Sequence, residues 1–205
     1  MLLVTVAALV LYVAYMAIAF GVRTIMQVRA TGSTGFVGIG GRPGSLPWLA
    51  GVLFAVAIVA GFVSPLLVLT DTLSLIEALD GPALNWIGVA LAAAGIALTF
   101  ASQTAMGASW RIGVDESERT ELVTSGPFTR MRNPIFTAML LAALGLALMV
   151  PTAWSIAALL ALLVALELQV RIIEEPYLLS AQGEEYRSYA ARTGRFLPGV
   201  GKLAS

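Results

Sequence analysis

The sequence predicts an all-α integral membrane protein that forms a single domain over residues 1–205. Apolar residue types make up 59% of the chain and charged residues only 12%, whereas soluble domains carry about a quarter charged residues. Several uncharged runs also reach the roughly 20 residues that a helix needs to cross the hydrocarbon core of a bilayer. Because lipid does not tolerate unpaired backbone groups, such runs predict helices and not open strands.

The uncharged runs divide into five membrane-spanning helices. The run that follows Asn133 is too long for one span, and Pro151 near its middle would break a helix. We therefore expect spans four and five to form a tight helical hairpin. The expected spans are about residues 1–22, 48–70, 82–106, 134–150 and 152–173.

The basic residues predict the orientation of these spans. All 12 Lys and Arg residues fall on one side of the predicted spans, and the opposite side carries only Asp71, Glu77 and Asp80. The positive-inside rule makes the basic side cytoplasmic. We therefore expect a multi-pass protein of the cell (inner) membrane, with its N-terminus outside and its C-terminus inside. The catalytic elements would be cytoplasmic, in residues 107–133 and 174–200.

Composition also limits the chemistry. The chain has no Cys and no His, and its formal net charge is zero. Thiolate nucleophiles, imidazole bases and Cys/His metal sites are therefore excluded, and a nucleic-acid partner is disfavoured because it would need a basic face. Carboxylates, Arg, Tyr, backbone groups or a cofactor remain to carry the chemistry, and we expect no metal.

Ionisable residues gather at the inner end of the fifth span. Glu167, Arg171, Glu174 and Glu175 follow at steps of four, three and one, which predicts one shared helical face. An ionisable residue at the depth of Glu167 is a functional candidate by default, so we predict Glu167 and Arg171 as catalytic residues. The alternative is a simple ion pair across one turn. The side chains of the polar run Ser102–Thr104 would line a cavity together with these residues, or would hydrogen-bond to one another at a helix end.

The segments outside the predicted spans have their own patterns. Trp110–Val114 and Glu121–Thr124 are β-prone pieces that predict a small hairpin-like excursion. The glycine-rich stretch 31–44 predicts a flexible loop. Alternating apolar and charged residues after Pro176 predict a C-terminal amphipathic helix that ends at Gly194.

The order of short motifs over roughly residues 107–200 resembles the isoprenylcysteine carboxyl methyltransferases and the related phospholipid methyltransferases. Members of that family carry paired glutamates after a helical hairpin and a closing Arg-Phe-x-Pro. The matching pieces here are Gly126-Pro127-Phe128, Arg132-Asn133-Pro134-Ile135-Phe136, Glu174-Glu175, Leu178, Gly183-Glu184-Glu185-Tyr186, Tyr189 and Arg195-Phe196-Leu197-Pro198.

This resemblance implies a membrane methyltransferase that uses S-adenosylmethionine and takes a lipophilic acceptor (an isoprenoid carboxylate, a lipid or a small hydrophobic molecule) from the bilayer. The cofactor's sulfonium is a compact cation that carboxylates and aromatic faces attract. Gln103, Trp110 and Arg111 are expected to contact the acceptor. By the resemblance, the cofactor would be held by Leu122, Val123, Thr124, Gly126, Pro127, Arg132, Asn133, Pro134, Phe136, Glu174 and Glu175.

Two positions depart from the family pattern, because Asn133 replaces a His and Phe136 replaces a Tyr. An Asn still donates a hydrogen bond but carries no charge. A carboxylate or thiolate acceptor would need no base, whereas a hydroxyl or amine would need help from Glu167 or a Tyr. Two alternatives stay open: an NADPH-dependent sterol or isoprenoid reductase, and a non-catalytic membrane factor on the same scaffold.

Overall fold

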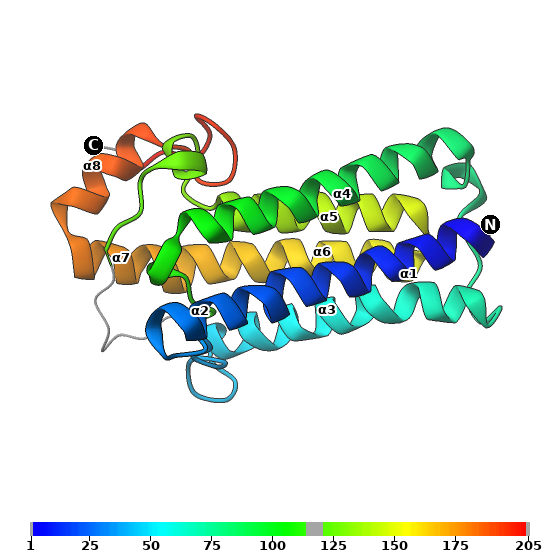
Figure 1. Cartoon of the computed structure of the whole chain (residues 1–205), viewed down its shortest axis with the longest axis horizontal. Helices are drawn as coiled ribbons and strands as arrows, with labels where there is room; N and C mark the ends of the chain where they lie inside the picture. Colours follow the sequence, from blue (N-terminus) through cyan, green and yellow to red (C-terminus); the bar gives the residue numbers. More distant parts are fainter. Residues whose placement is uncertain (1, 114–120, 204–205) are drawn as a thin grey trace.

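The computed structural model describes residues 2–113 and 121–203, and these form an elongated bundle of helices with the described ends of the chain at opposite ends (Figure 1). Within those residues no strand forms, and two isolated β-bridges link loops. The α-helices are α1 (Leu2–Met16), α2 (Arg23–Thr31), α3 (Leu46–Leu69), α4 (Pro82–Ala105), α5 (Pro134–Met149), α6 (Ala153–Leu168), α7 (Glu175–Gln182) and α8 (Glu184–Arg192). The short elements are η1 (Ala17–Val22), η2 (Glu77–Leu79), η3 (Gly107–Ser109), η4 (Gly126–Thr129) and η5 (Gln169–Glu174).

Four helical stretches are long and apolar enough to cross a membrane: Leu2–Thr31, Leu46–Leu69, Pro82–Ala105 and Ala153–Gln182. The all-helical membrane architecture predicted from the sequence is therefore confirmed. Of the five spans predicted, the fourth corresponds to α5, which is apolar but only 16 residues long.

The turn between α5 and α6 lies at Pro151, where the sequence predicted a break. Thr152 caps α6, because its hydroxyl accepts from the Ser155 backbone N–H at 2.9 Å and the Ser155 hydroxyl accepts from the Thr152 backbone N–H at 3.0 Å. The two helices nevertheless make their largest contacts elsewhere. Helix α5 packs chiefly against α4, and α6 packs chiefly against α3.

Glycines set the close approach of α4 and α5. A Cβ on Gly145 would lie 2.6 Å from the Gly88 carbonyl oxygen, and a Cβ on Gly95 would lie 2.7 Å from the Ala142 Cα. These distances leave no room for a side chain. Lipid gives two helices no hydrophobic reason to associate, so close backbone contact through small residues supplies the packing.

Two π-helical segments interrupt the long helices. Segment η1 joins α1 to α2, and η5 joins α6 to α7. A π turn contains one residue more than an α turn, so residues beyond it are rotated by about 100° from the positions that α-helical periodicity predicts. Segment η5 lies between Glu167 and Glu175, so uniform α-helical spacing does not describe how these two residues are placed relative to each other.

The glycine-rich sequence predicted a flexible loop after α2, but this loop makes backbone hydrogen bonds to the segment around Ile112. Phe36 forms a parallel bridge with Ile112: the Val37 N–H donates to the Ile112 carbonyl at 2.9 Å, and the Ile112 N–H donates to the Gly35 carbonyl at 2.7 Å. The turn of the predicted hairpin between Trp110 and Thr124 lies outside the described residues. Ile112, in the described part of the first β-prone piece, forms its bridge with the loop after α2.

The C-terminal segment contains two short helices where one amphipathic helix was predicted. Gly183 separates them, with a φ of 56° in the left-handed region that favours glycine. Tyr186 and Tyr189 on α8 are buried against Leu122 and Leu178. We call η4, α7, α8 and residues 193–203 the cap, because they close one end of the bundle (Figure 1).

Candidate functional site

A buried ion-pair cluster holds the cap together around Glu175. Its Oε1 accepts from an Arg132 guanidinium nitrogen at 2.7 Å and from Arg195 Nε at 2.8 Å, while its Oε2 accepts from a second Arg195 nitrogen at 2.9 Å. The side chains of Arg132, Arg195 and Glu175 are only 2%, 14% and 9% exposed. The hydrogen-bonded Glu175 carboxylate raises the pKa of Arg195 above its ordinary value. Two guanidinium groups of the protein itself therefore satisfy the Glu175 carboxylate.

Arg132 also ties the cap to the start of α5 through the backbone. Its guanidinium donates to the carbonyl oxygens of Ala190, Thr193 and Gly201 at 3.0, 2.5 and 3.0 Å. The Arg132 N–H donates in turn to the Gly194 carbonyl at 2.8 Å. A guanidinium with its donors fixed in a planar fork suits such a set of acceptors better than an ammonium would.

Asn133, the next residue in the chain, also attaches the cap to α5. Its side-chain amide donates to the Arg195 carbonyl at 3.1 Å, and the Thr137 hydroxyl one turn later donates to the Phe196 carbonyl at 2.7 Å. Asn133 directly precedes α5, but its side chain makes no capping hydrogen bond. Asn133 therefore contributes to holding residues 195–196 beside α5.

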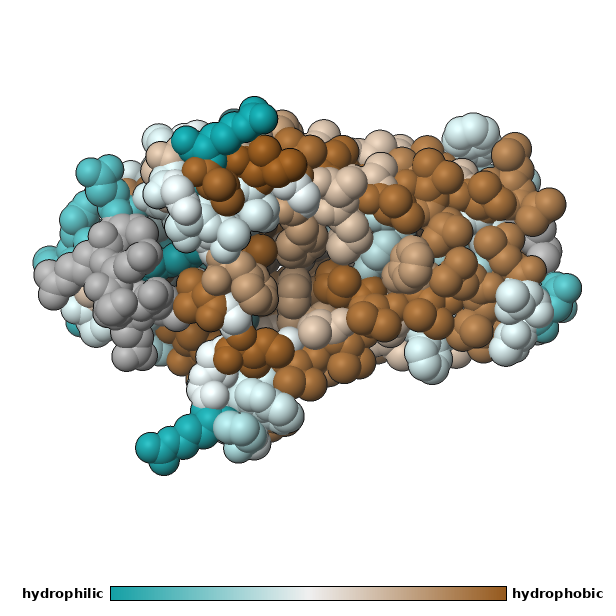
Figure 2. Space-filling view, turned by 60° about the horizontal axis from the view of Figure 1, so that its bottom comes forward, coloured by the Kyte–Doolittle hydropathy of each residue, from teal (hydrophilic) through white to brown (hydrophobic). Residues whose placement is uncertain are grey.

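A cavity of about 880 Å³ extends from the cap into the bundle, within the range that ligand pockets of proteins occupy. Figure 2 shows the molecule hollowed on one side, with mostly apolar residues around the recess. The cap end of the cavity is polar, with Glu174, Arg132 and Tyr177 in its wall. The bundle end is apolar, with Phe54 and Met139 in its wall.

Glu174 lies beside Glu175 in sequence but in a different setting. Among the described residues it accepts one hydrogen bond, from the Gln169 side chain at 3.3 Å. Arg111 lies near enough to act on it electrostatically. Arg111 itself lies over the Tyr177 ring, 5.6 Å from the ring centre, and donates to the Tyr177 hydroxyl at 3.3 Å. The polar end of the cavity thus offers a carboxylate beside an aromatic face.

Arg23 holds Trp110, which forms part of the cavity wall, in position. Its guanidinium lies over the Trp110 ring at 4.5 Å and donates to the carbonyl oxygens of Gln103 and Gly107, at 3.3 and 2.5 Å. These carbonyls stand at and just beyond the C-terminal end of α4, where backbone acceptors lack helical partners and a cation is favoured.

Most of the predicted site residues meet at this cavity. Those in its wall are Gln103, Trp110, Arg111, Leu122, Val123, Arg132, Asn133, Pro134, Phe136, Glu174 and Glu175. Five predicted residues are not part of the wall: Thr124, Gly126, Pro127, Glu167 and Arg171. Glu167 and Arg171 form an ion pair with each other, with side chains 34% and 55% exposed, as the simpler interpretation of their spacing expected.

Sequence reasoning identified Trp110 and Phe136 but missed other aromatic residues of the wall. Tyr15, Phe54 and Tyr177 line the cavity together with Tyr186 and Tyr189 of α8. Burial raises the pKa of Tyr189 to about 12, and its hydroxyl donates to the Phe128 carbonyl at 2.7 Å. Two tyrosines three residues apart after a glycine were visible as a motif. Tyr15 and Phe54 carried no local signal, because each lies in an unbroken apolar run.

Comparisons with known proteins give the family. Over 116 residues the chain is 35% identical to the nickel-cobalt-cadmium resistance protein NccN of Alcaligenes xylosoxydans xylosoxydans, a match that covers 56% of this chain and 53% of that relative. The chain thus spans about half the length of the curated relative it matches.

A solved structure shares the fold. The structure of the eukaryotic intramembrane Ras methyltransferase, an isoprenylcysteine carboxyl methyltransferase, superposes with a TM-score of 0.64 at 18% identity, over 94% of this chain and 67% of that one. The family model for phospholipid methyltransferase matches residues 83–185, which run from α4 through the start of α8 and include Arg132, Glu174 and Glu175. The chain belongs to the phospholipid methyltransferase family.

Proposed function

We propose that this protein is an S-adenosylmethionine-dependent methyltransferase that acts on a lipophilic acceptor within the membrane. One observation carries the proposal: a single cavity joins a polar end in the cap to an apolar end between the helices. A charged cofactor and an apolar acceptor need opposite surroundings, and this cavity provides both within one continuous space. Membership in a methyltransferase family supports the same assignment.

The residues at the polar end fit the cofactor. When bound, S-adenosylmethionine supplies a methyl group activated by its sulfonium. The Glu174 carboxylate suits the cofactor's ammonium or ribose hydroxyls. Glu175 differs from the role that the resemblance implied. Because two arginines already satisfy it, its part is to hold the cap in place.

The apolar end fits a lipophilic acceptor. Phe54, Ile58 and Met139 come from α3 and α5 and present only carbon and sulfur to the cavity. The recess in Figure 2 gives such a molecule a route from the bilayer. Methyl transfer is an in-line displacement, so alignment of the two reactants and exclusion of water supply most of the acceleration. A chain without His or Cys can provide both.

The finer membrane topology belongs to the same proposal. Helix α5 would be the fifth crossing, antiparallel to α4 and α6, with its shorter apolar length completed by the residues around Pro151. The cap would be cytoplasmic and the N-terminus outside, because the Arg residues of the loop after α2, of the cap and of the segment before α5 gather at the same end of the bundle.

The test is a calorimetric titration of the purified protein in detergent with S-adenosylhomocysteine. We expect micromolar binding that Glu174→Gln weakens by about tenfold, since one charge-assisted hydrogen bond contributes about 1.5–3 kcal/mol. Glu77→Gln, an exposed carboxylate at the opposite end of the bundle, is the matched control and should bind like the wild type. Folded wild-type protein that shows no binding would rule out the methyltransferase assignment.

A further inference from the structure

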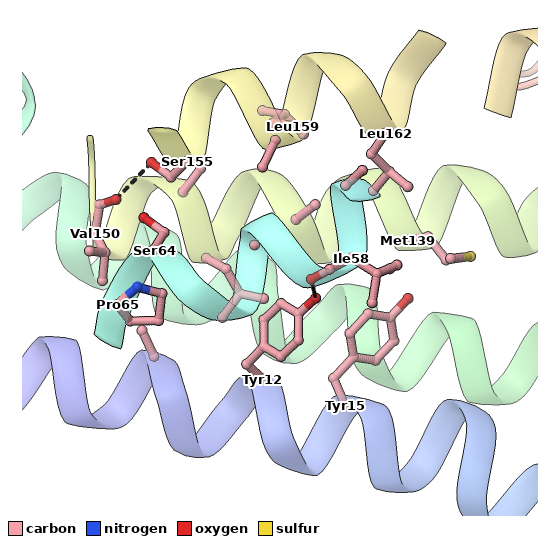
Figure 3. Close-up of a pocket in the computed structure, with 17 residues that line it drawn as sticks. Tyr12, Tyr15, Ile58, Ser64, Pro65, Met139, Val150, Ser155, Leu159 and Leu162 are labelled. Atoms are coloured by element: carbon pink, nitrogen blue, oxygen red, sulfur yellow. Dashed lines mark hydrogen bonds between the residues drawn. The ribbon is translucent and has the colours of Figure 1, made fainter. Parts of the chain in front are cut away.

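Two cavities lie one behind the other along the bundle. The large cavity lies beside residues 47–59 of α3 and 134–139 of α5. A second cavity, of about 50 Å³, lies beside residues 57–65 of α3 and 139–147 of α5 (Figure 3). The small cavity therefore continues the line of the large one, away from the cap and toward the far end of the bundle.

The boundary between the two cavities is formed by residues from three helices. Among the residues that the structure describes, those that line both cavities are Tyr15 of α1, Ile58 of α3 and Met139 of α5 (Figure 3). Tyr15 and Met139 are buried, at 4% and 5% exposure, and belong to one apolar cluster. We call Tyr15, Ile58 and Met139 the partition, because they stand where the large cavity ends and the small one begins.

The α3 side of the partition is held by a hydrogen bond from α1. The Tyr12 hydroxyl donates to the Ile58 carbonyl at 2.5 Å (Figure 3). Gly61 leaves room for this contact, since a Cβ there would lie 3.2 Å from a ring carbon of Tyr12. Met139 has an unbranched side chain of the kind that fills irregular gaps. Its size can therefore be changed without removing the bond that joins α1 to α3.

The small cavity suits the end of an apolar chain. Leu159 and Leu162 line it from α6. Ser64 and Ser155 also line it, but both have protein partners: Ser64 bonds to Thr152 at 3.0 Å, and Ser155 donates to the Val150 carbonyl at 2.8 Å. Its volume of about 50 Å³ exceeds the roughly 30 Å³ that one water molecule takes in the liquid. About two methylene groups, each similar in size to water, would fit there.

We propose that the partition limits the length of the apolar chain that the acceptor extends into the bundle. The reacting end of the acceptor lies toward the polar end of the large cavity, so its chain runs toward Tyr15 and Met139 and stops there. The direction of the chain rests on the proposed function, but the length limit itself needs no cofactor. A chain that instead left through the recess into the bilayer would meet no limit.

The test uses straight-chain alkan-1-ols of increasing length and the full-length protein in lipid nanodiscs. Thermal stabilisation is measured against the mole fraction of each alcohol in the bilayer, which gives an apparent affinity by linkage. Carbons that fit the cavity should leave this affinity nearly level, because lipid tails are as apolar as the cavity wall. Once the chain meets the partition, overpacking should lower the affinity by about tenfold.

Substitutions locate the limit at the partition. Met139→Ala opens it and should move the fall in affinity to chains about two carbons longer, the length that the small cavity can hold. Leu162→Ala is the matched control, because Leu162 is also 5% exposed and lines the small cavity but not the large one. It leaves the partition closed and should keep the wild-type limit. In Met139→Ala/Ala143→Leu, the new side chain one turn along α5 refills the entrance to the small cavity and should restore that limit.

Three results would overturn the proposal. Affinity that stays level at every length would mean that long chains leave through the recess. A limit that is the same in Met139→Ala as in the wild type would show that the partition does not set it, and an equal shift in Leu162→Ala would show that any added space does. Ile58→Ala opens the partition from α3 and keeps the backbone carbonyl that binds Tyr12. It carries the same expectation if Met139→Ala is too unstable to measure.

This test and the titration with S-adenosylhomocysteine fail separately. A protein that binds S-adenosylhomocysteine but accepts every chain length equally keeps the proposed function and loses the role of the partition. A protein whose length limit shifts in Met139→Ala but which binds no S-adenosylhomocysteine keeps a length-selective site for lipophiles and loses the methyltransferase assignment.

Discussion

The α4–α5 contact and the cap are held together by opposite means. In the first, glycine lets two backbones touch, and no charge takes part. In the second, the helices α7 and α8 are short, and a buried carboxylate between two guanidinium groups supplies the attachment. The difference teaches which changes each region can accept. The α4–α5 contact does not accept added volume, whereas the cap does not accept the loss of a buried charge.

The largest expected fall in Tm comes from a substitution that disrupts the cap and leaves the α4–α5 contact intact. Glu175→Gln leaves Arg132 buried with a neutral partner, and breaking a buried pair costs about 3–5 kcal/mol. We expect a large fall in Tm in detergent and loss of binding of S-adenosylhomocysteine, with the helix content of the bundle retained by circular dichroism. Glu184→Gln, from an exposed pair with Arg187 on α8, is the control and should change neither quantity. A stable Glu175→Gln protein would contradict the role assigned to the cluster.

The next largest fall in Tm is expected from a substitution that disrupts the α4–α5 contact and leaves the ion pairs of the cap intact. Gly145→Val places carbon atoms against the Gly88 carbonyl and the Ala92 backbone, and overpacking of this kind costs about 1–3 kcal/mol. The Tm should fall while the relative effect of Glu175→Gln stays the same, since the two sites are distant and additive. Gly21→Val, where no atom lies within 4 Å of the added Cβ, should be close to neutral. Equal Tm values for the two valine variants would show that the contact does not set stability.

An intermediate effect is expected at the C-terminal end of α4, where Arg23 binds. Arg23→Lys keeps the charge but loses the planar fork over Trp110 and toward two carbonyl oxygens, which we expect to cost about 1–2 kcal/mol. The emission of Trp110 should shift as its ring becomes less fixed. Arg29→Lys, an exposed position on α2, should leave both Tm and emission as they are. A Lys that preserves the emission would show that charge alone positions Trp110.

The smallest effect concerns the pair that the sequence predicted as catalytic. Arg171→Gln removes an exposed ion pair with Glu167, and such pairs contribute about 0–1 kcal/mol. We expect a small change in Tm and unchanged binding of S-adenosylhomocysteine. A loss of affinity as large as that of Glu174→Gln would place Arg171 in the site after all.

The sequence predicted the helices and most of the cavity wall from patterns that are local. Long uncharged runs gave the membrane helices, and Pro151 gave the break between α5 and α6. The motif around Arg132 and the Glu174–Glu175 pair identified residues that do meet. These patterns do not predict that Arg195 joins Arg132 and Glu175 in the ion-pair cluster. Arg195 reaches Glu175 only because α7 and α8 turn the chain back.

The other main difference concerns Glu167 and Arg171. α-Helical spacing placed them on the face of Glu174 and Glu175, but only the second pair lines the cavity. The irregular segment η5 lies between Glu167 and Glu175, so α-helical spacing does not apply throughout this stretch. Residues 169–174 carry no Pro or Gly that would have marked the irregularity. Register beyond such a turn follows from tertiary packing, which a single sequence does not display.

The position of Arg132 in the chain has a consequence for biogenesis. Its guanidinium emerges from the ribosome before α5, but its partners Glu175, Ala190, Thr193 and Gly201 are made later. Helices α1, α3 and α4 precede Arg132, and α5 and α6 are synthesised while this charge still lacks its buried partners. Membrane insertion comes first and closure of the cap last, so a ribosome stalled before residue 195 would hold an inserted bundle whose cap lacks the Arg195–Glu175 ion pair.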